Sequence, residues 1–272
     1  MGFSVNTNAG ALVALQNLNK TNSQLNIVQS RINTGLKVAG AKDDASVFAI
    51  AQKQRAELGG LRAVKSSLDR ATGAVDVALA GAEAVSDLLV QLKEKAVASR
   101  DQGNDATSRG LLNNDYRQLV SQINTIVKNA QFNGLNALQA NNIVAIVDAN
   151  GLSANAITIT AQDIDSTTLA LATTSIDTSA NALAAVTAIS TAIATVNASL
   201  SALGAGSKRI EVVGTFIEKL SDAIEVGIGN LVDADLARES ANLQSLQVKQ
   251  QLGLQALSIA NQAPGTVLSL FR

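Results

Sequence analysis

A single proline, Pro264, occurs in the 272 residues of the chain. Proline removes a backbone donor and clashes with the preceding helical turn, so it ends or kinks α-helices. Nothing of this kind interrupts residues 2–263. The sequence therefore permits helices much longer than the three or four turns usual in globular proteins, and we expect a mainly α fold.

The apolar residues available to join such helices are small and aliphatic. Hydrophobic residues make up 47% of the chain, but aromatic residues only 2%. Ala, Leu, Ile and Val at regular spacing suit close helix–helix seams, whereas thick globular cores use aromatic bulk. We therefore predict an elongated helical rod with coiled-coil character.

The ionisable residues exclude several classes of function. Lys and Arg total 21 against 22 Asp and Glu, so the chain lacks the positive excess typical of nucleic-acid binders. It has no His and no Cys, which removes zinc sites, thiol chemistry and most general-base catalysis. We predict no enzyme activity, no cofactor and no metal. No stretch of about 18 uninterrupted apolar residues occurs, so no membrane span is expected.

Two terminal segments carry apolar and small residues that step by four and three, along 11–36 and 236–261. This spacing is typical of a heptad seam. The residues predicted to form the assembly interface are Leu15, Leu18, Leu25, Ile32, Leu36, Leu243, Leu254, Leu257 and Leu268. The polar residues predicted to restrict register are Asn22, Gln29, Gln247 and Gln250.

Each terminal stripe is apolar at only about half of its seam positions. Neither could offset the ordering entropy of ~1–2 kcal/mol per residue alone, so each needs a partner. The stripes could simply form an ordinary intramolecular core. Pairing with each other still exposes Leu and Ile, however, which favours contacts with further copies. Contacts between different patches that do not close generate an open helical filament.

The middle of the chain predicts three further helices and a small β region. A helix starting near residues 42–44 should run to about Gly103, and a shorter antiparallel helix should follow around 112–130. Residues 139–172 alternate apolar and polar, and Asn150-Gly151 suits a two-residue hairpin turn, so we predict one or two hairpins. Helical spacing resumes near Ser179 and continues past a weak point at Gly204 and Gly206 to Ile224, with an expected end at Gly227 and Gly229.

Four ordered motifs then carry a resemblance to a known family. They are RINTGLKVAGAKDDASVFAIA (31–51), FNGLNAL (132–138), DADLARE (233–239) and the tail ANQAPGTVLSLFR (260–272). Together they resemble the conserved motifs of bacterial flagellins, the subunits of the flagellar filament.

The resemblance implies a domain organisation. Residues 1–44 and 231–272 would form a terminal coiled-coil domain that lines the inner tube of the filament. Residues 45–138 and 173–230 would form a three-main-helix outer-tube core, with a small β-hairpin region at 139–172. The outer variable domains of larger flagellins would be missing or vestigial.

The resemblance also implies a setting. The subunit would be secreted by the flagellar export machinery with a chaperone, and would polymerise with itself or with related flagellins in the extracellular filament. Cap and hook-junction proteins would be its other partners. A hook–filament junction protein of the same superfamily is an alternative. A chemoreceptor-like coiled-coil signalling module is another, but it leaves the LSLFR end unexplained.

Overall fold

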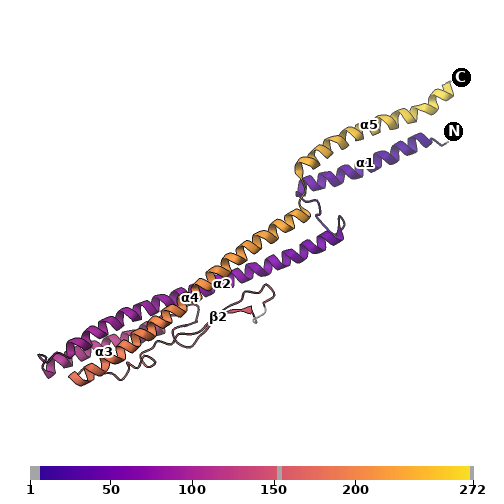
Figure 1. Ribbon diagram of the computed structural model, residues 1–272. Coiled ribbons are helices and arrows are strands. Elements are labelled where there is room, and N and C mark those ends of the chain that lie inside the picture. Colours follow the sequence, from indigo (N-terminus) through magenta and orange to yellow (C-terminus); the bar gives the residue numbers. More distant parts are fainter. Residues whose placement is uncertain (1–6, 152–154, 270–272) are drawn as a thin grey trace. The chain divides into compact units, whose positions relative to one another are not determined.

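The computed structural model describes the backbone of residues 7–151 and 155–269, and side chains as far as Gln262. Five helices and one two-stranded sheet follow one another along it, confirming the predicted mainly α fold with a small hairpin region (Figure 1). The chain forms two compact units, one from residues 1–56 with 223–272 and one from residues 57–222.

In the first unit, α1 (Ala9–Thr34) and α5 (Leu236–Ser269) lie side by side (Figure 1). Asn8 caps α1, because its side-chain oxygen accepts the Ala11 N–H at 3.1 Å. Gly35, with φ 71°, ends the helix in the left-handed conformation that glycine adopts without strain. Asp235 caps α5 by accepting two N–H groups of its first turn, so each helix of the pair begins at a side-chain cap.

Three long helices form the frame of the rest of the chain: α2 (Ala45–Ser99), α3 (Ala106–Asn129) and α4 (Ser179–Val232). Asp44 begins α2 by accepting the N–H groups of Ser46 and Val47, each at 3.0 Å. As predicted, α4 continues past the weak point at Gly204 and Gly206, and the helix has no break there.

Close packing explains one of these glycines. A Cβ at Gly206 would lie 2.7 Å from Cδ1 of Ile159, so glycine lets the β region approach α4. The expected end of this helix at Gly227 and Gly229 is wrong, since α4 continues to Val232. In α4, a glycine therefore either makes room for a neighbouring side chain or is tolerated despite its low helix propensity. None of these glycines ends the helix.

The β region is one hairpin. Strands β1 (Ile143–Ala145) and β2 (Ile157–Ile159) pair antiparallel, with Ile143 opposite Ile159. The end residues of each strand are buried and the middle one is exposed, as the alternating pattern predicted. The two-residue turn is wrong, because residues 146–156 separate the strands and Asn150-Gly151 lies within that connection.

The core of the second unit contains the single tyrosine of the chain. Tyr116 on α3 is fully buried, and its hydroxyl shares a 2.6 Å hydrogen bond with the Thr174 hydroxyl. Asn136 donates to the carbonyl of Val127 at 2.7 Å and accepts the Leu138 N–H at 3.0 Å, which fixes the segment after α3. The predicted helices therefore share their core with the connecting segment between α3 and α4.

One helix of the described chain, α4, is long and apolar enough to cross a membrane by length and composition. Its most apolar 18-residue window has a mean hydropathy of 1.6, and 28% of that window is buried. The sequence between Asp177 and Lys208 has no charged residue, yet Ser, Thr and Asn recur through it. Counting only uninterrupted apolar residues therefore missed this window.

Candidate assembly interface

The seam between α1 and α5 is narrow. Leu25, Val28 and Leu246 form its buried cluster, with Ile32 and Leu243 packed against them. Leu18 is also buried, and a Cβ at Gly253 would lie 3.2 Å from its side chain. The two helices therefore approach closely where the sequence places a glycine opposite a leucine.

The structure corrects the predicted phase of both terminal seams. Leu18, Leu25, Ile32, Leu243 and Leu257 lie at buried or half-buried seam positions, as predicted. The alternate positions are off by one residue. The half-buried or buried residues there are Ala14, Val28, Leu246 and Gly253, whereas Leu15, Gln29, Gln247 and Leu254 are exposed.

The cause of this error is a choice between two equivalent spacings. The predicted stripe steps by four and then three from Ala11, whereas the buried face of α1 steps by three and then four. Both spacings keep a heptad period, and the alternatives Ala14 and Leu15 are both apolar. Periodicity alone could therefore not separate the centre of the seam from its flank.

Two of the four polar residues predicted to restrict register meet across the seam. Gln250 donates from Nε2 to Oδ1 of Asn22 at 2.8 Å, and both are half-buried. Gln29 and Gln247 are exposed instead. The Asn22–Gln250 hydrogen bond is suited to favour one alignment of the two helices, and the register role of all four residues stays a prediction.

An ion pair lies at the other end of the seam. Arg31 donates from Nη1 to Oε1 of Glu239 at 3.1 Å, with 11% of the Glu239 side chain exposed. The second carboxylate oxygen, Oε2, is buried without a hydrogen-bond partner among the described residues. Arg31 is the described side chain that pairs with this buried carboxylate, which also lies in the first turn of α5, where the helix dipole favours negative charge.

Next to this pair, the segments between helices are joined by main-chain hydrogen bonds. Leu36 and Asp233 form an isolated antiparallel bridge. The Ala234 N–H donates to the Gly35 carbonyl at 2.9 Å, and the Lys37 N–H donates to the Val232 carbonyl at 2.6 Å. We call residues 35–38 with 232–234 the joint. Leu36, predicted as an assembly residue, is half-buried there.

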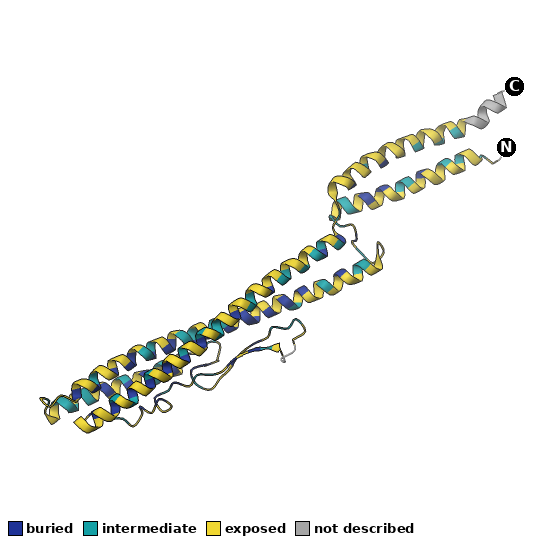
Figure 2. Cartoon of the chain, viewed as in Figure 1, coloured by how far each residue is buried: buried dark blue, intermediate teal, exposed yellow. Residues whose placement is uncertain are grey.

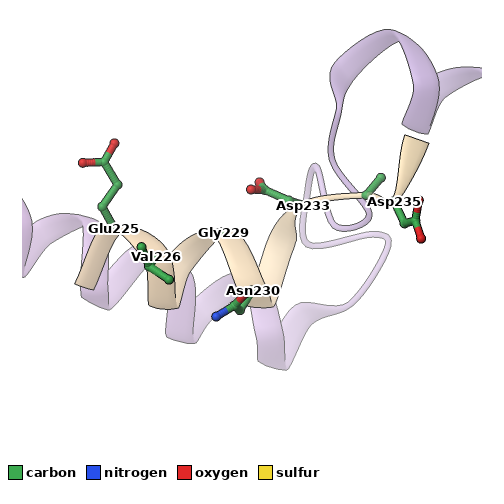
Figure 3. A pocket seen from close by; sticks show the side chains of 7 residues that line it. Glu225, Val226, Gly229, Asn230, Asp233 and Asp235 are labelled. Carbon is green, nitrogen blue, oxygen red and sulfur yellow. The ribbon is translucent and has the colours of Figure 1, made fainter. Parts of the chain in front are cut away.

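An acidic groove of about 500 Å³ runs from the end of α4 to the start of α5. Figure 3 shows Glu225 and Asp233 on either side of Gly229, with Asp235 beyond them. A Cβ at Gly229 would lie 2.8 Å from Oδ2 of Asp233, so glycine gives this carboxylate room. Among the described residues, no group of three His, Cys, Asp or Glu side chains could hold a metal ion.

Figure 2 shows that most residues of the α1–α5 pair are exposed. Large apolar residues are among them. On α1 they are Leu12, Val13, Leu15 and Ile27, and on α5 they are Leu236, Val248, Leu252, Leu254 and Ile259. Only Leu15 and Leu254 belong to the predicted interface. Leu236 begins the stepped stripe of α5, and the other six lie off the two stripes. The sequence signal for these six is that apolar residues occur on more than one face of each helix. Leu268 lies outside the described side chains.

Comparisons with known proteins bear directly on these terminal helices. Residues 5–143 match the family model of the bacterial flagellin N-terminal helical region, and residues 186–271 match that of the C-terminal helical region. Flagellin FljK of Caulobacter vibrioides is 46% identical over 273 residues, spanning 99% of this chain and 98% of the relative. FljM of the same organism is 47% identical over 270 residues, with the same coverage.

More distant proteins agree. A Brucella melitensis flagellin is 36% identical over 284 residues, spanning 99% of both chains. The crystal structure of Bacillus cereus flagellin matches the fold with a TM-score of 0.51 at 22% identity, over 56% of this chain and 88% of that one. With both terminal helical regions matched and relatives aligned nearly end to end, the chain belongs to the bacterial flagellin family.

Proposed function

We propose that this chain is a structural subunit that polymerises through the α1–α5 pair into the flagellar filament, outside the cell. One observation carries the proposal. In the described part of the pair, four large apolar residues are buried, namely Leu18, Leu25, Val28 and Leu246, whereas nine are exposed. Burying a Leu or Ile side chain contributes about 1.5–3 kcal/mol, so covering a few of the nine gives a strong drive to associate.

The interface residues divide into two groups under this proposal. Leu18, Leu25 and the residues packed with them hold α1 against α5 within one subunit. Leu15 and Leu254 are available to a neighbouring subunit, because they are exposed beside the seam. Residues 1–44 and 231–272 would line the inner tube, and residues 45–138 and 173–230 would form the outer tube, with the 139–172 region beside them.

The proposal includes the partners that a flagellin needs. The export machinery and a chaperone would deliver the chain, and cap and hook-junction proteins would bound the filament. No catalytic activity is expected, because the chain has neither His nor Cys and the family is structural. The junction-protein and signalling alternatives gain no support from the relatives, which carry the name flagellin.

The test is seeded polymerisation. Purified chain is added to short filament fragments, and elongation is measured by electron microscopy. The double variant Leu15→Ser and Leu254→Ser should fail to elongate, because it removes apolar contacts between subunits. The matched control is Val144→Ser, which replaces an exposed apolar residue of β1.

Circular dichroism of each monomer shows whether the helices persist. Normal elongation by the double variant with wild-type helicity would exclude this interface. Failure of the wild-type chain to elongate on seeds would exclude self-assembly as its function and would favour a junction role.

A further inference from the structure

The charges of the α1–α5 pair lie toward one end of it. The charged residues of the two helices are Lys20, Arg31, Arg238, Glu239 and Lys249. Residues 1–19 and 250–271 have none. The two uncharged stretches lie together, because Asn22 contacts Gln250 and the Asn8 side chain donates to the Ala260 carbonyl at 2.5 Å. We call the described part of these stretches, 9–19 with 250–262, the uncharged end.

Exposed apolar side chains are concentrated at the uncharged end. Six of the nine on the pair lie there, namely Leu12, Val13, Leu15, Leu252, Leu254 and Ile259. Their number is unusual because a helix that faces water on one side normally presents charged or polar residues there. A helix with apolar residues on several faces is one that neighbours cover on several faces.

Helical phase sorts these residues into two patches. Successive residues are about 100° apart around a helix, and like flanks of an antiparallel pair face the same way. Leu15 on α1 and Leu254 on α5 flank the seam on the same side, with Leu12 one turn from Leu15. We call Leu12, Leu15 and Leu254 the flank patch. Their side chains are 59%, 43% and 53% exposed.

The second patch lies on α5 alone. Val248, Leu252 and Ile259 fall within about 40° of one another, on the side opposite the seam. They are 55%, 59% and 69% exposed, and we call them the back patch. The corresponding side of α1 carries Val13 and Ile27 with Lys20 between them, so the uninterrupted apolar stripe belongs to α5.

We infer that the flank patch of one subunit docks on the back patch of the next copy of this chain. The inference rests on the proposed function, which supplies other copies as the neighbours. A patch that docks on itself gives a closed dimer, whereas two different patches on each subunit join copies in an open series. The pair presents two such patches, both free of charge, so neither requires an oppositely charged partner.

Thiol crosslinking tests this pairing without a background, since the chain has no native cysteine. Leu15→Cys and Leu252→Cys are made separately and together. Filaments are then oxidised, and a short bifunctional maleimide is used in parallel. The double variant should give a ladder of trimers and higher oligomers. A copolymer of the two single variants should give dimers, and each single variant alone should stay monomeric.

Several outcomes would overturn the inference. Dimers from a filament of one single variant would show that a patch contacts itself. Normal filaments without a ladder from this pair or from Leu12→Cys with Ile259→Cys would exclude the contact while leaving the proposed function intact. Absence of filaments from the wild-type chain would instead contradict the proposed function. Flotation of the monomer with phosphatidylcholine vesicles, with Leu252→Cys becoming shielded from maleimide, would assign the back patch to lipid.

Discussion

Gly59 and Gly60 are adjacent in α2, and only Gly60 lies against another segment of the chain. Gly59→Ala is therefore a control for the steric effect of Gly60→Ala. Both Gly59→Ala and Gly60→Ala gain about 1 kcal/mol of helix propensity. A Cβ at Gly59 meets nothing within 4 Å, but at Gly60 it would lie 2.5 Å from the Ala149 carbonyl oxygen and 2.9 Å from the Ala149 Cβ. Ordinary contact begins at 3.4 Å, so the 146–156 connection must move by roughly 0.9 Å, the difference between these two distances.

That movement meets resistance from hydrogen bonds. The Ile146 N–H donates to the Ser67 hydroxyl at 3.0 Å, and Asp148 accepts the Asn150 N–H at 2.8 Å. Overpacking of this kind costs about 1–3 kcal/mol. Because the propensity gain is shared, Gly60→Ala should be less stable than Gly59→Ala by about that amount, or by about 2–12 °C in Tm for a unit of this size.

Thermal unfolding followed by tyrosine fluorescence measures this difference. Tyr116 is the single tyrosine, the chain has no tryptophan, and Tyr116 is buried in the same unit as Gly60. Gly59→Ala should raise the Tm above that of the wild type. A Gly60→Ala variant as stable as Gly59→Ala would refute the close approach of the connection to α2.

Three further perturbations have expected outcomes. Arg31→Met should weaken hydrogen-exchange protection of α1 by roughly 30-fold, since leaving a buried carboxylate unpaired costs about 2 kcal/mol. Glu239→Gln should weaken this protection less, because water can hydrate the half-exposed Arg31. A larger loss of protection in Glu239→Gln than in Arg31→Met would contradict the burial of Glu239. Asp105 caps α3, and its hydrogen bond from the Ser108 N–H lowers the pKa of the Asp105 carboxyl below 3.8. The capping contribution should therefore be full above that pH and should disappear as the pH falls through the lowered pKa, so Asp105→Ala should speed exchange at residues 106–112 at pH 7 but not in strong acid. The hydrogen bond from Lys65 lowers the pKa of the Glu218 carboxyl, yet both side chains are about half exposed; Lys65→Met should lower the Tm slightly in low salt, and a decrease that persisted in about 1 M NaCl would contradict a screened surface pair.

Much of the fold follows from local chemistry that the sequence displays. The absence of proline before Pro264 permits the long helices, and Asn8, Asp44, Asp105 and Asp235 begin four of them through side-chain caps. The alternation around Ile157 and Ile159 identifies a buried strand face. These features act within a few residues, so a single sequence is enough to interpret them.

The errors concern packing partners that lie far away in the sequence. Ala14 and Leu15 are both apolar, and only packing against α5 decides that Ala14 faces the seam. The reason for a glycine at 206 becomes visible only when Ile159, far earlier in the chain, is placed against it. The same limit applies to the candidate interface: the stepped stripe found Leu15 and Leu254, but Leu252 and Ile259 become notable only when α1 covers the opposite face of α5.

The joint has a topological consequence. Its main-chain hydrogen bonds bring residues 35–38 and 232–234 together, so the nearly 200 residues between them form a closed loop whose two ends are fixed at one place. Closing a longer loop costs little more entropy, about 0.6 kcal/mol for each doubling of a flexible loop. Because these bonds use no side chain of the intervening segment, that segment can gain or lose residues while the paired ends keep their alignment. In sequence terms, the chain is a helical hairpin interrupted by an inserted segment, and the number of residues in that segment sets the length of the chain.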